Sequence, residues 1–357
     1  MIKEAVRKLI QREDLSEQEA YLAMGDVVEG KATASQIAAF ATAARMKGLA
    51  VQEIIGAVKA VRERLPCIPA REDLIVLDRE EINLDEETLY QTFSGNGIRT
   101  KTFTISTATA FVVAGAGARV AKSGNSGPSD FFGGEQVLRA LGIELRISTS
   151  LVERCIEEMG VGFLYTPVFQ GPWRPTLEVR RQMGFRTLFN LIGPLCNPCG
   201  AQKLFLGVYE PESMTTLAQV LKALGIQRGV IVHGQDSLDE VSITGKTLIC
   251  RADPSGLHFH EILPEDVGLK RAKVEDIAGG NAADNARIIR EVLSGETGAR
   301  RDVVVLSAAL ALMAACKAKD IPQGMEMARS AIDSREALRR LEGVVRLTNE
   351  RGYARAL

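Results

Sequence analysis

The sequence predicts an α/β protein with a small helical lobe at the N-terminus and a larger lobe built on a mainly parallel central sheet. Two observations predict this division. The first 65 residues carry helical patterns, whereas beyond Phe93 short β-type segments alternate with helical ones. Such alternation is typical of parallel strands joined by crossover helices. We place the boundary near residue 70, with 1–70 as the helical lobe and 71–357 as the α/β lobe.

The composition narrows the class of protein. The 357 residues are 46% hydrophobic and 25% charged, enough for a large core. A net charge of −1 gives no reason to expect nucleic acid or an anionic membrane as a partner, because proteins that bind them usually carry a basic excess. The charged N-terminus and the lack of a run of about 18 apolar residues predict a cytoplasmic protein. The six scattered cysteines are expected to be buried thiols.

The N-terminal lobe is predicted as a series of amphipathic helices. Ser16–Glu19 (SEQE) and Thr33–Gln36 (TASQ) each have the spacing of a capping box ahead of an apolar-periodic run. Gly48 is placed to end the second of these helices, and residues 51–64 repeat apolar side chains on one helix face. These patterns predict a small helical bundle.

The connection between the lobes is expected to be Arg71 to Thr92, which is polar and acidic. Six carboxylates lie between Asp78 and Glu87. We interpret the whole segment as a solvated connection rather than a metal site, because nothing in the spacing of the carboxylates fixes a ligand geometry.

The larger lobe is predicted from β-type segments separated by helical patterns such as residues 214–225 (MTTLAQVLKALG). In a parallel sheet, ligands bind at the carboxyl ends of the strands, so the loops that follow are where chemistry is expected. The β-type segments are 101–107 (KTFTIST), 118–122 (ARVAK), 204–209 (LFLGVY) and 229–233 (GVIVH).

The first loop of interest is Ser94 to Phe111. It places Gly95 and Gly97 ahead of a strand and the pair Ser106-Thr107 at the start of a helix. Backbone N–H groups and hydroxyls at a helix N-terminus favour a phosphate. A simple hydroxyl cap would give the same pattern, so this loop alone leaves both interpretations open.

The second loop follows Lys122 and is rich in glycine and small polar residues. Lys122 supplies a positive charge, and the loop offers backbone and side-chain donors before a helix that begins near Gly134. This composition suits a bound anion, but taken alone it also fits an ordinary surface loop, so both interpretations stay open. The donors lie at Gly124, Asn125, Gly127 and Ser129.

The third loop is His233 to Ser242, which follows the apolar strand GVIV and carries the adjacent carboxylates Asp239 and Glu240. Hard cations bind such oxygens, and Mg²⁺ commonly uses one or two carboxylates together with substrate phosphates. The loop is therefore a candidate magnesium site.

Five segments together resemble anthranilate phosphoribosyltransferase: TISTATAF, VAKSGN, GFRTLFNLIGPLCNP, DEVS and GGNAADNARIIREVLSGETGARRDVVVLSAALAL. The resemblance runs through nearly the whole chain. It implies a two-lobed fold shared with class II nucleoside phosphorylases, with helices from about 165–190 joining the helical lobe, and a homodimer formed through that lobe. The implied reaction transfers ribose 5-phosphate from phosphoribosyl pyrophosphate (PRPP) to the amine of anthranilate in tryptophan biosynthesis, with Mg²⁺ on the pyrophosphate.

The resemblance also assigns roles to individual residues and implies no catalytic acid or base. The metal would be held by Ser106, Asp239 and Glu240, and the acceptor would be bound by Asn125, Gln170 and Arg180. A guanidinium suits the carboxylate of an aromatic acid because it forms bidentate hydrogen bonds. The residues implied for PRPP are Gly95, Gly97, Thr102, Thr104, Ser106, Thr107, Lys122, Gly124, Asn125 and Ser129.

Several positions depart from the family's pattern. SGNGIR stands where the family has GTGGDG, KSGNS stands for KHGNR, and a glutamine replaces a histidine ahead of Arg180. Each lost charge-assisted bond costs roughly 1.5–3 kcal/mol, so we expect weaker PRPP binding and a changed acceptor. Pentosyl transfer to another base or amine, phosphorolysis, and a non-catalytic binding role stay open. The departing residues are Ile98, Ser123, Ser126, Phe132 and Gln170.

Other eye-catching residues are given structural interpretations. Cys196 and Cys199 form a CxxC pair with no second pair, so neither zinc nor redox chemistry is expected. The alternate residues His258 and His260 share one face of a strand and are expected at the surface. The remaining histidine, His233, is expected to end its strand, and the single tryptophan, Trp173, to serve in packing.

Overall fold

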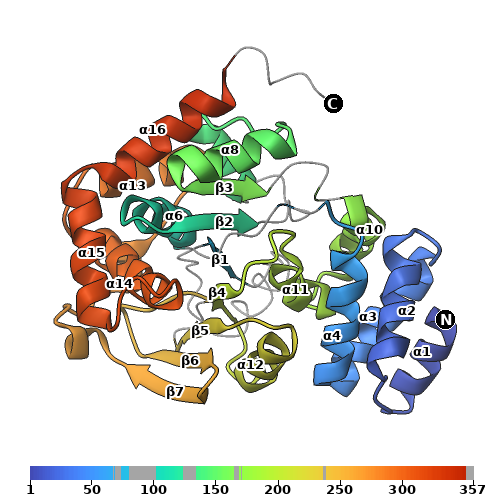
Figure 1. The fold of residues 1–357 in the computed structure, drawn as a ribbon. Helices are drawn as coiled ribbons and strands as arrows, with labels where there is room; N and C mark the ends of the chain where they lie inside the picture. Colours follow the sequence, from blue (N-terminus) through green and yellow to red (C-terminus); the bar gives the residue numbers. More distant parts are fainter. Residues whose placement is uncertain are drawn as a thin grey trace.

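The computed structural model describes residues 1–66, 68, 74–79, 102–123, 134–164, 169, 171–235 and 239–350. It has a helical lobe beside an α/β lobe, as the sequence predicts (Figure 1). Helices α10 (Arg174–Met183) and α11 (Leu188–Ile192) lie between the two and pack against helices of the first lobe. Within the described ranges, no helix combines the length and the apolar character needed to cross a bilayer.

The helical lobe consists of α1 (Ile2–Ile10), α2 (Glu17–Val28), α3 (Ala34–Lys47) and α4 (Val51–Arg62). Both predicted capping boxes are confirmed: the Ser16 hydroxyl accepts the Glu19 N–H at 3.3 Å, and Thr33 accepts that of Gln36 at the same distance. Gly48 ends α3 with a φ of 90°, which favours glycine.

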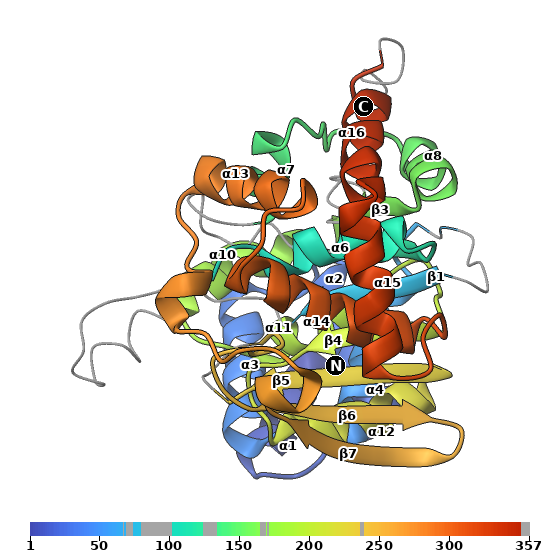
Figure 2. The same ribbon diagram turned by 90° about the vertical axis from the view of Figure 1, so that its left-hand side faces the viewer.

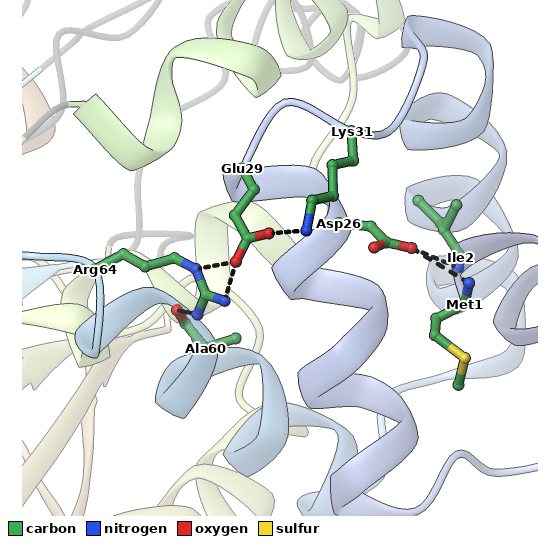
Figure 3. A network of polar contacts seen from close by, with 7 residues as sticks. All are labelled: Met1, Ile2, Asp26, Glu29, Lys31, Ala60 and Arg64. Carbon is green, nitrogen blue, oxygen red and sulfur yellow. Dashed lines mark hydrogen bonds and ion pairs between the residues drawn. The ribbon is translucent and has the colours of Figure 1, made fainter.

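Polar contacts fix the ends of these helices relative to one another (Figure 3). Arg64, just beyond α4, donates to the Glu29 carboxylate at the end of α2 with an Nε–Oε1 distance of 2.9 Å. In the last turn of the same helix, Asp26 Oδ2 lies 3.3 Å from the N-terminal amine. The ion pairs with Lys31 and Arg64 lower the pKa of Glu29 to about 2.

The central sheet has seven strands in the order β3-β2-β1-β4-β5-β6-β7. Strands β1 to β5 run parallel to one another, whereas β6 is antiparallel to β5 and β7 is antiparallel to β6. The carboxyl ends of the parallel strands therefore lie on one side of the sheet. Figure 1 shows the arrowheads of β2 and β3 directed toward α10 and α11. The strands are β1 (Leu74–Arg79), β2 (Arg119–Ser123), β3 (Val161–Leu164), β4 (Lys203–Gly207), β5 (Arg228–Gly234), β6 (Thr247–Asp253) and β7 (Gly256–Ile262).

Two sequence-based expectations about this sheet are wrong. The first described part of the supposed solvated connection, Leu74 to Arg79, is β1, the strand between β2 and β4. Its Ile75 and Leu77 are fully buried. The segment 101–107 is not a named strand where it is described, because Thr102 forms only an isolated bridge to Ala278 and the chain turns into a helix at Ile105.

Helices cover both faces of the sheet. One face packs against α6 (Ile105–Gly115) and α14 (Ala299–Ala314), and the other against α8 (Thr149–Met159) and α12 (Ser213–Ala223). Figure 2 shows α13 to α16 stacked on the side away from the helical lobe. The remaining helices are α7 (Gly134–Ala140), α13 (Ala282–Leu293), α15 (Ile321–Asp333), α16 (Glu336–Thr348) and the 3₁₀ turns η1 (Gly171–Trp173), η2 (Pro194–Cys196), η3 (Pro264–Val267) and η4 (Val274–Ile277).

Candidate active site

The N-terminus of α6 is buried and lacks a side-chain cap. Thr104 occupies the N-cap position, but its side chain makes no capping hydrogen bond. Ser106 and Thr107 follow in the first turn and are 4% and 0% exposed. The simple hydroxyl cap that the sequence left open is therefore absent at Thr104. The Ile105 and Thr107 N–H groups donate to the carbonyl oxygens of Phe103 and Thr104, whereas the Ser106 N–H is directed to a partner outside the helix.

The carboxylate loop after β5 supplies this partner for Ser106. The Ser106 N–H donates to Glu240 Oε1 at 3.2 Å, across 134 residues of sequence. Glu240 is 3% exposed and its neighbour Asp239 is 8% exposed. A carboxylate at this position is stabilised by the partial positive charge of the helix N-terminus. The fold thus brings the predicted phosphate-binding turn and the predicted metal carboxylates together.

Lys122 lies at the carboxyl end of β2 and is 3% exposed. Side chains alternate along a strand, so Lys122 is on the same face as Val120, which belongs to the core cluster that contains residues of α6. Lys122 and the α6 turn therefore lie on the same face of the sheet. This placement agrees with the predicted role of Lys122 as a positive charge beside an anion.

Arg180 is in α10 and is 5% exposed, so it is not a surface charge. Helix α10 contacts α2 and α3 and ends at Gly184, whose φ is 67°. Burial of a guanidinium beside the lobe boundary suits recognition of a carboxylate, because a bidentate pair is strongest away from water.

Sequence reasoning missed Arg186, which precedes α11. It is 5% exposed, and its guanidinium carbon lies 3.9 Å from the ring centroid of Tyr209, just beyond β4. The next residue, Glu210, accepts a hydrogen bond from Arg45 of α3 at 2.9 Å. That bond, together with the charge of Arg186, holds the pKa of Glu210 below its usual range. Arg186 lies in the GFRTLFN motif, which was the signal that could have identified it. Its stacking partner Tyr209 is distant in sequence, so the contact could not be predicted.

The predicted site residues divide into those that the structure describes and those outside it. Two of the described residues, Thr102 and Thr104, precede α6, and Ser106 and Thr107 are in its first turn. Lys122 is near the end of β2, on the same face of the sheet as α6. Ser123 is the last residue of β2. The predicted residues outside the described ranges are Gly95, Gly97, Ile98, Gly124, Asn125, Ser126, Gly127, Ser129, Phe132 and Gln170.

The expectation of buried thiols is confirmed for four of the five cysteines that the structure describes, and Cys67 lies outside the described residues. Cys196 and Cys199 are buried free thiols, at 3% and 0% exposure. Cys316 is exposed rather than buried, because it lies in the turn after α14, with a left-handed φ of 60°. No group of three or more metal-ligating side chains is present among the described residues.

The tryptophan and the three histidines lie where the sequence predicts. Trp173 is 4% exposed within the apolar core, as expected of packing. His233 lies near the end of β5, and its Nδ1 is 3.0 Å from the carbonyl oxygen of Val208. His258 and His260 are on β7, where His258 is partly exposed and His260 is exposed.

The donor set at the α6 turn suits a hard cation with an anionic ligand. Asp239 and Glu240 supply two buried carboxylates. The buried Thr107 Oγ1 has no hydrogen-bond partner among the residues that the structure describes. Carboxylate and hydroxyl oxygens are ligands that suit Mg²⁺.

Comparison with known proteins covers nearly the whole chain. The helical bundle domain of the glycosyl transferase family matches residues 3–65, and the a/b domain of the same family matches residues 88–338. The chain is 45% identical over 350 residues to anthranilate phosphoribosyltransferase of Geotalea uraniireducens, covering 98% of this chain and 100% of the relative. The Geobacter sulfurreducens enzyme of the same name is 44% identical over 350 residues, with the same coverage.

Solved structures agree with this assignment. Anthranilate phosphoribosyltransferase from Thermus thermophilus has a TM-score of 0.85 at 35% identity, covering 96% of this chain and 99% of that one. The Saccharomyces cerevisiae protein, solved with PRPP and Mg, has a TM-score of 0.82 at 24% identity, covering 97% of each chain, and supports the fold. From its two matched domains and its full-length relatives, the chain belongs to the anthranilate phosphoribosyltransferase family.

Proposed function

We propose that the protein transfers ribose 5-phosphate from PRPP to the amine of anthranilate or a related aromatic acceptor. The single observation that carries the proposal is the 3.2 Å hydrogen bond from the Ser106 N–H to Glu240. It places a carboxylate pair against a helix N-terminus, which is the combination that a pyrophosphate and its cation require. The family relationship supports the same reaction.

Positioning and charge are sufficient for this chemistry. Departure of pyrophosphate leaves a cation-like ribose carbon, which an aromatic amine attacks without a strong base. The first turn of α6 and Lys122 would hold the phosphate groups, together with the loop residues that the family resemblance assigns. Ser106, Asp239 and Glu240 would hold Mg²⁺, whose charge offsets that of the departing pyrophosphate.

We assign acceptor binding to Arg180, with Asn125 and Gln170 as further contacts implied by the resemblance. The burial of Arg180 supports this assignment, since a buried guanidinium gains more from a carboxylate partner than a solvated one does. The altered positions Ile98, Ser123, Ser126 and Gln170 favour an acceptor other than anthranilate itself as the second candidate.

We further propose a cytoplasmic homodimer that associates through the helical lobe, with 1–70 and 71–357 as the two domains and the 165–190 helices joining the first. Two large apolar residues on adjacent helices support the dimer. Ile10, the last residue of α1, is 69% exposed, and Met46 of α3 is 75% exposed. Apolar side chains at a surface favour contact with a partner. The described cysteines are free thiols, in keeping with a reducing compartment.

The direct test is an activity assay with PRPP, Mg²⁺ and a panel of aromatic amines that includes anthranilate. Product formation with anthranilate at a kcat of about 10 s⁻¹, the median for enzymes, supports the first candidate. Turnover of another amine in its place supports the second. Lack of turnover with every amine, while PRPP and Mg²⁺ still bind, would support the non-catalytic alternative.

A further inference from the structure

A loop remote in sequence packs directly on the segment that leads into α6. The Phe103 N–H donates to the Ile277 carbonyl oxygen at 3.1 Å, and Thr102 bridges Ala278 in antiparallel fashion. We call residues 277–281, between η4 and α13, the buttress loop. Its backbone thus contacts the two residues that come three and four positions ahead of Ser106.

Gly279 makes the closest approach in this contact. A Cβ on Gly279 would lie 2.7 Å from Phe103 Cα and 2.8 Å from Phe103 N. It would also lie 2.5 Å from Asn285 Oδ1. Two of these three atoms are backbone, which has no rotamer to move aside, so any larger residue must displace the segment or the loop.

Asn285 holds the buttress loop in its shape. It is 5% exposed, its Oδ1 accepts the Gly280 N–H at 3.2 Å, and its Nδ2 donates to the Gly280 carbonyl oxygen at 3.2 Å. From the next helix, Arg300 donates to the Ala278 carbonyl oxygen at 3.0 Å. The loop is therefore braced on both sides of Gly279.

We propose that Gly279 and Asn285 are positioning residues for the α6 turn, which rests on the proposed function for the identity of the ligand. The Ile105 N–H donates to the Phe103 carbonyl oxygen at 2.7 Å, so the helix begins directly from the buttressed residue. Ser106 then meets Glu240. A displacement of Phe103 therefore moves both the start of α6 and the Ser106 N–H that contacts Glu240. A misplacement of about 1 Å at a binding site costs on the order of a hundredfold in rate.

The test compares Gly279→Ala with Gly324→Ala in the full-length protein. Gly324 is a matched control because its Cβ would meet Ala309 backbone atoms at 2.8 Å, where α15 packs on α14. Hydrogen exchange measured by mass spectrometry reports on residues 102–107 whatever the ligand. We expect exchange at 102–107 to be about tenfold faster in Gly279→Ala than in the parent, equivalent to about 1.4 kcal/mol. In Gly324→Ala, exchange at 102–107 should increase by no more than the loss of global stability accounts for.

Binding and kinetics supply the second readout. In Gly279→Ala the KM for PRPP should rise about tenfold at saturating Mg²⁺, whereas Gly324→Ala should lower the melting temperature and leave KM unchanged. Asn285→Ala removes both hydrogen bonds to Gly280 and adds no atom. If Gly279→Ala does not fold, Asn285→Ala replaces it in the comparison with Gly324→Ala.

The outcomes are distinct. Unchanged exchange at 102–107 in Gly279→Ala and Asn285→Ala, or an equal increase in Gly324→Ala, would overturn the positioning role. A selective increase in exchange in a protein whose parent form binds neither PRPP nor Mg²⁺ would support the positioning role and overturn the proposed function.

Discussion

Replacing Glu240 separates its two roles, as an acceptor for α6 and as a negative charge. Glu240→Gln keeps an oxygen that accepts the Ser106 N–H, whereas Glu240→Ala removes it. The bond is 3.2 Å long, at the weak end of the usual N–H···O range, and both residues are nearly fully buried. Charge-assisted bonds contribute about 1.5–3 kcal/mol, so we take the lower limit of about 1.5 kcal/mol for the loss in Glu240→Ala. The glutamine variant should lose under about 1 kcal/mol, because a neutral bond of about 0.5–1.5 kcal/mol remains.

Cation binding should follow the charge rather than the hydrogen bond. Both variants should bind Mg²⁺ with pyrophosphate at least about tenfold more weakly than the parent, equivalent to about 1.4 kcal/mol. Urea unfolding measures the first quantity and titration calorimetry the second. Glu342→Gln, on the exposed surface of α16, is the control for loss of one negative charge. Parental Mg²⁺ binding in Glu240→Gln would refute the assignment of Glu240 as a metal ligand.

Three further predictions concern other parts of the chain. Restoring the family residues together should raise kcat/KM for anthranilate by more than the sum of the single changes, because donors around one phosphate act as a unit; an efficient parent enzyme would contradict the changed acceptor. That variant is Ile98→Asp, Ser123→His, Ser126→Arg and Gln170→His. Ile10→Lys with Met46→Lys should shift the mass measured by light scattering from dimer to monomer, and a parent that is already monomeric would contradict the dimer. Glu29 has a folded pKa of about 2, below its ordinary 4.5, so its stabilising effect is present above pH 4.5 and is lost as the pH falls toward 2; melting curves of Glu29→Gln should show a shallower pH dependence there than those of the parent.

Local patterns predicted the elements whose cause is local. The capping boxes at Ser16 and Thr33 depend on residues three positions apart, and both form. The strands ending at Lys122 and His233 are apolar runs with clear limits, and they appear close to the expected positions. The meeting of Glu240 with Ser106 agrees with the family resemblance, which assigns both residues to one metal site.

The features that the sequence did not predict depend on contacts between distant parts of the chain or on patterns without a clear period. Strand β1 is a short apolar run between charged residues, and a strand buried on both faces shows no alternation that would separate it from its acidic surroundings. The segment before α6 has β-type residues, but the buttress loop binds only one bridge position before the helix begins. Arg186 was not predicted because stacking on Tyr209 depends on a neighbour brought in by β4.

The hydrogen bond from Ser106 to Glu240 joins two points 134 residues apart. A fragment that stops before β5 lacks Glu240 and therefore cannot form this contact, nor can a chain whose sheet has not yet assembled. A ligand that bridges the α6 turn and the carboxylate loop has affinity for the completed fold alone, so by mass action it shifts the folding equilibrium, by about 2.7 kcal/mol at a hundred times its Kd. The substrate is then also a late-acting aid to folding, and the cellular supply of that ligand helps to determine how much of the chain persists in its native form.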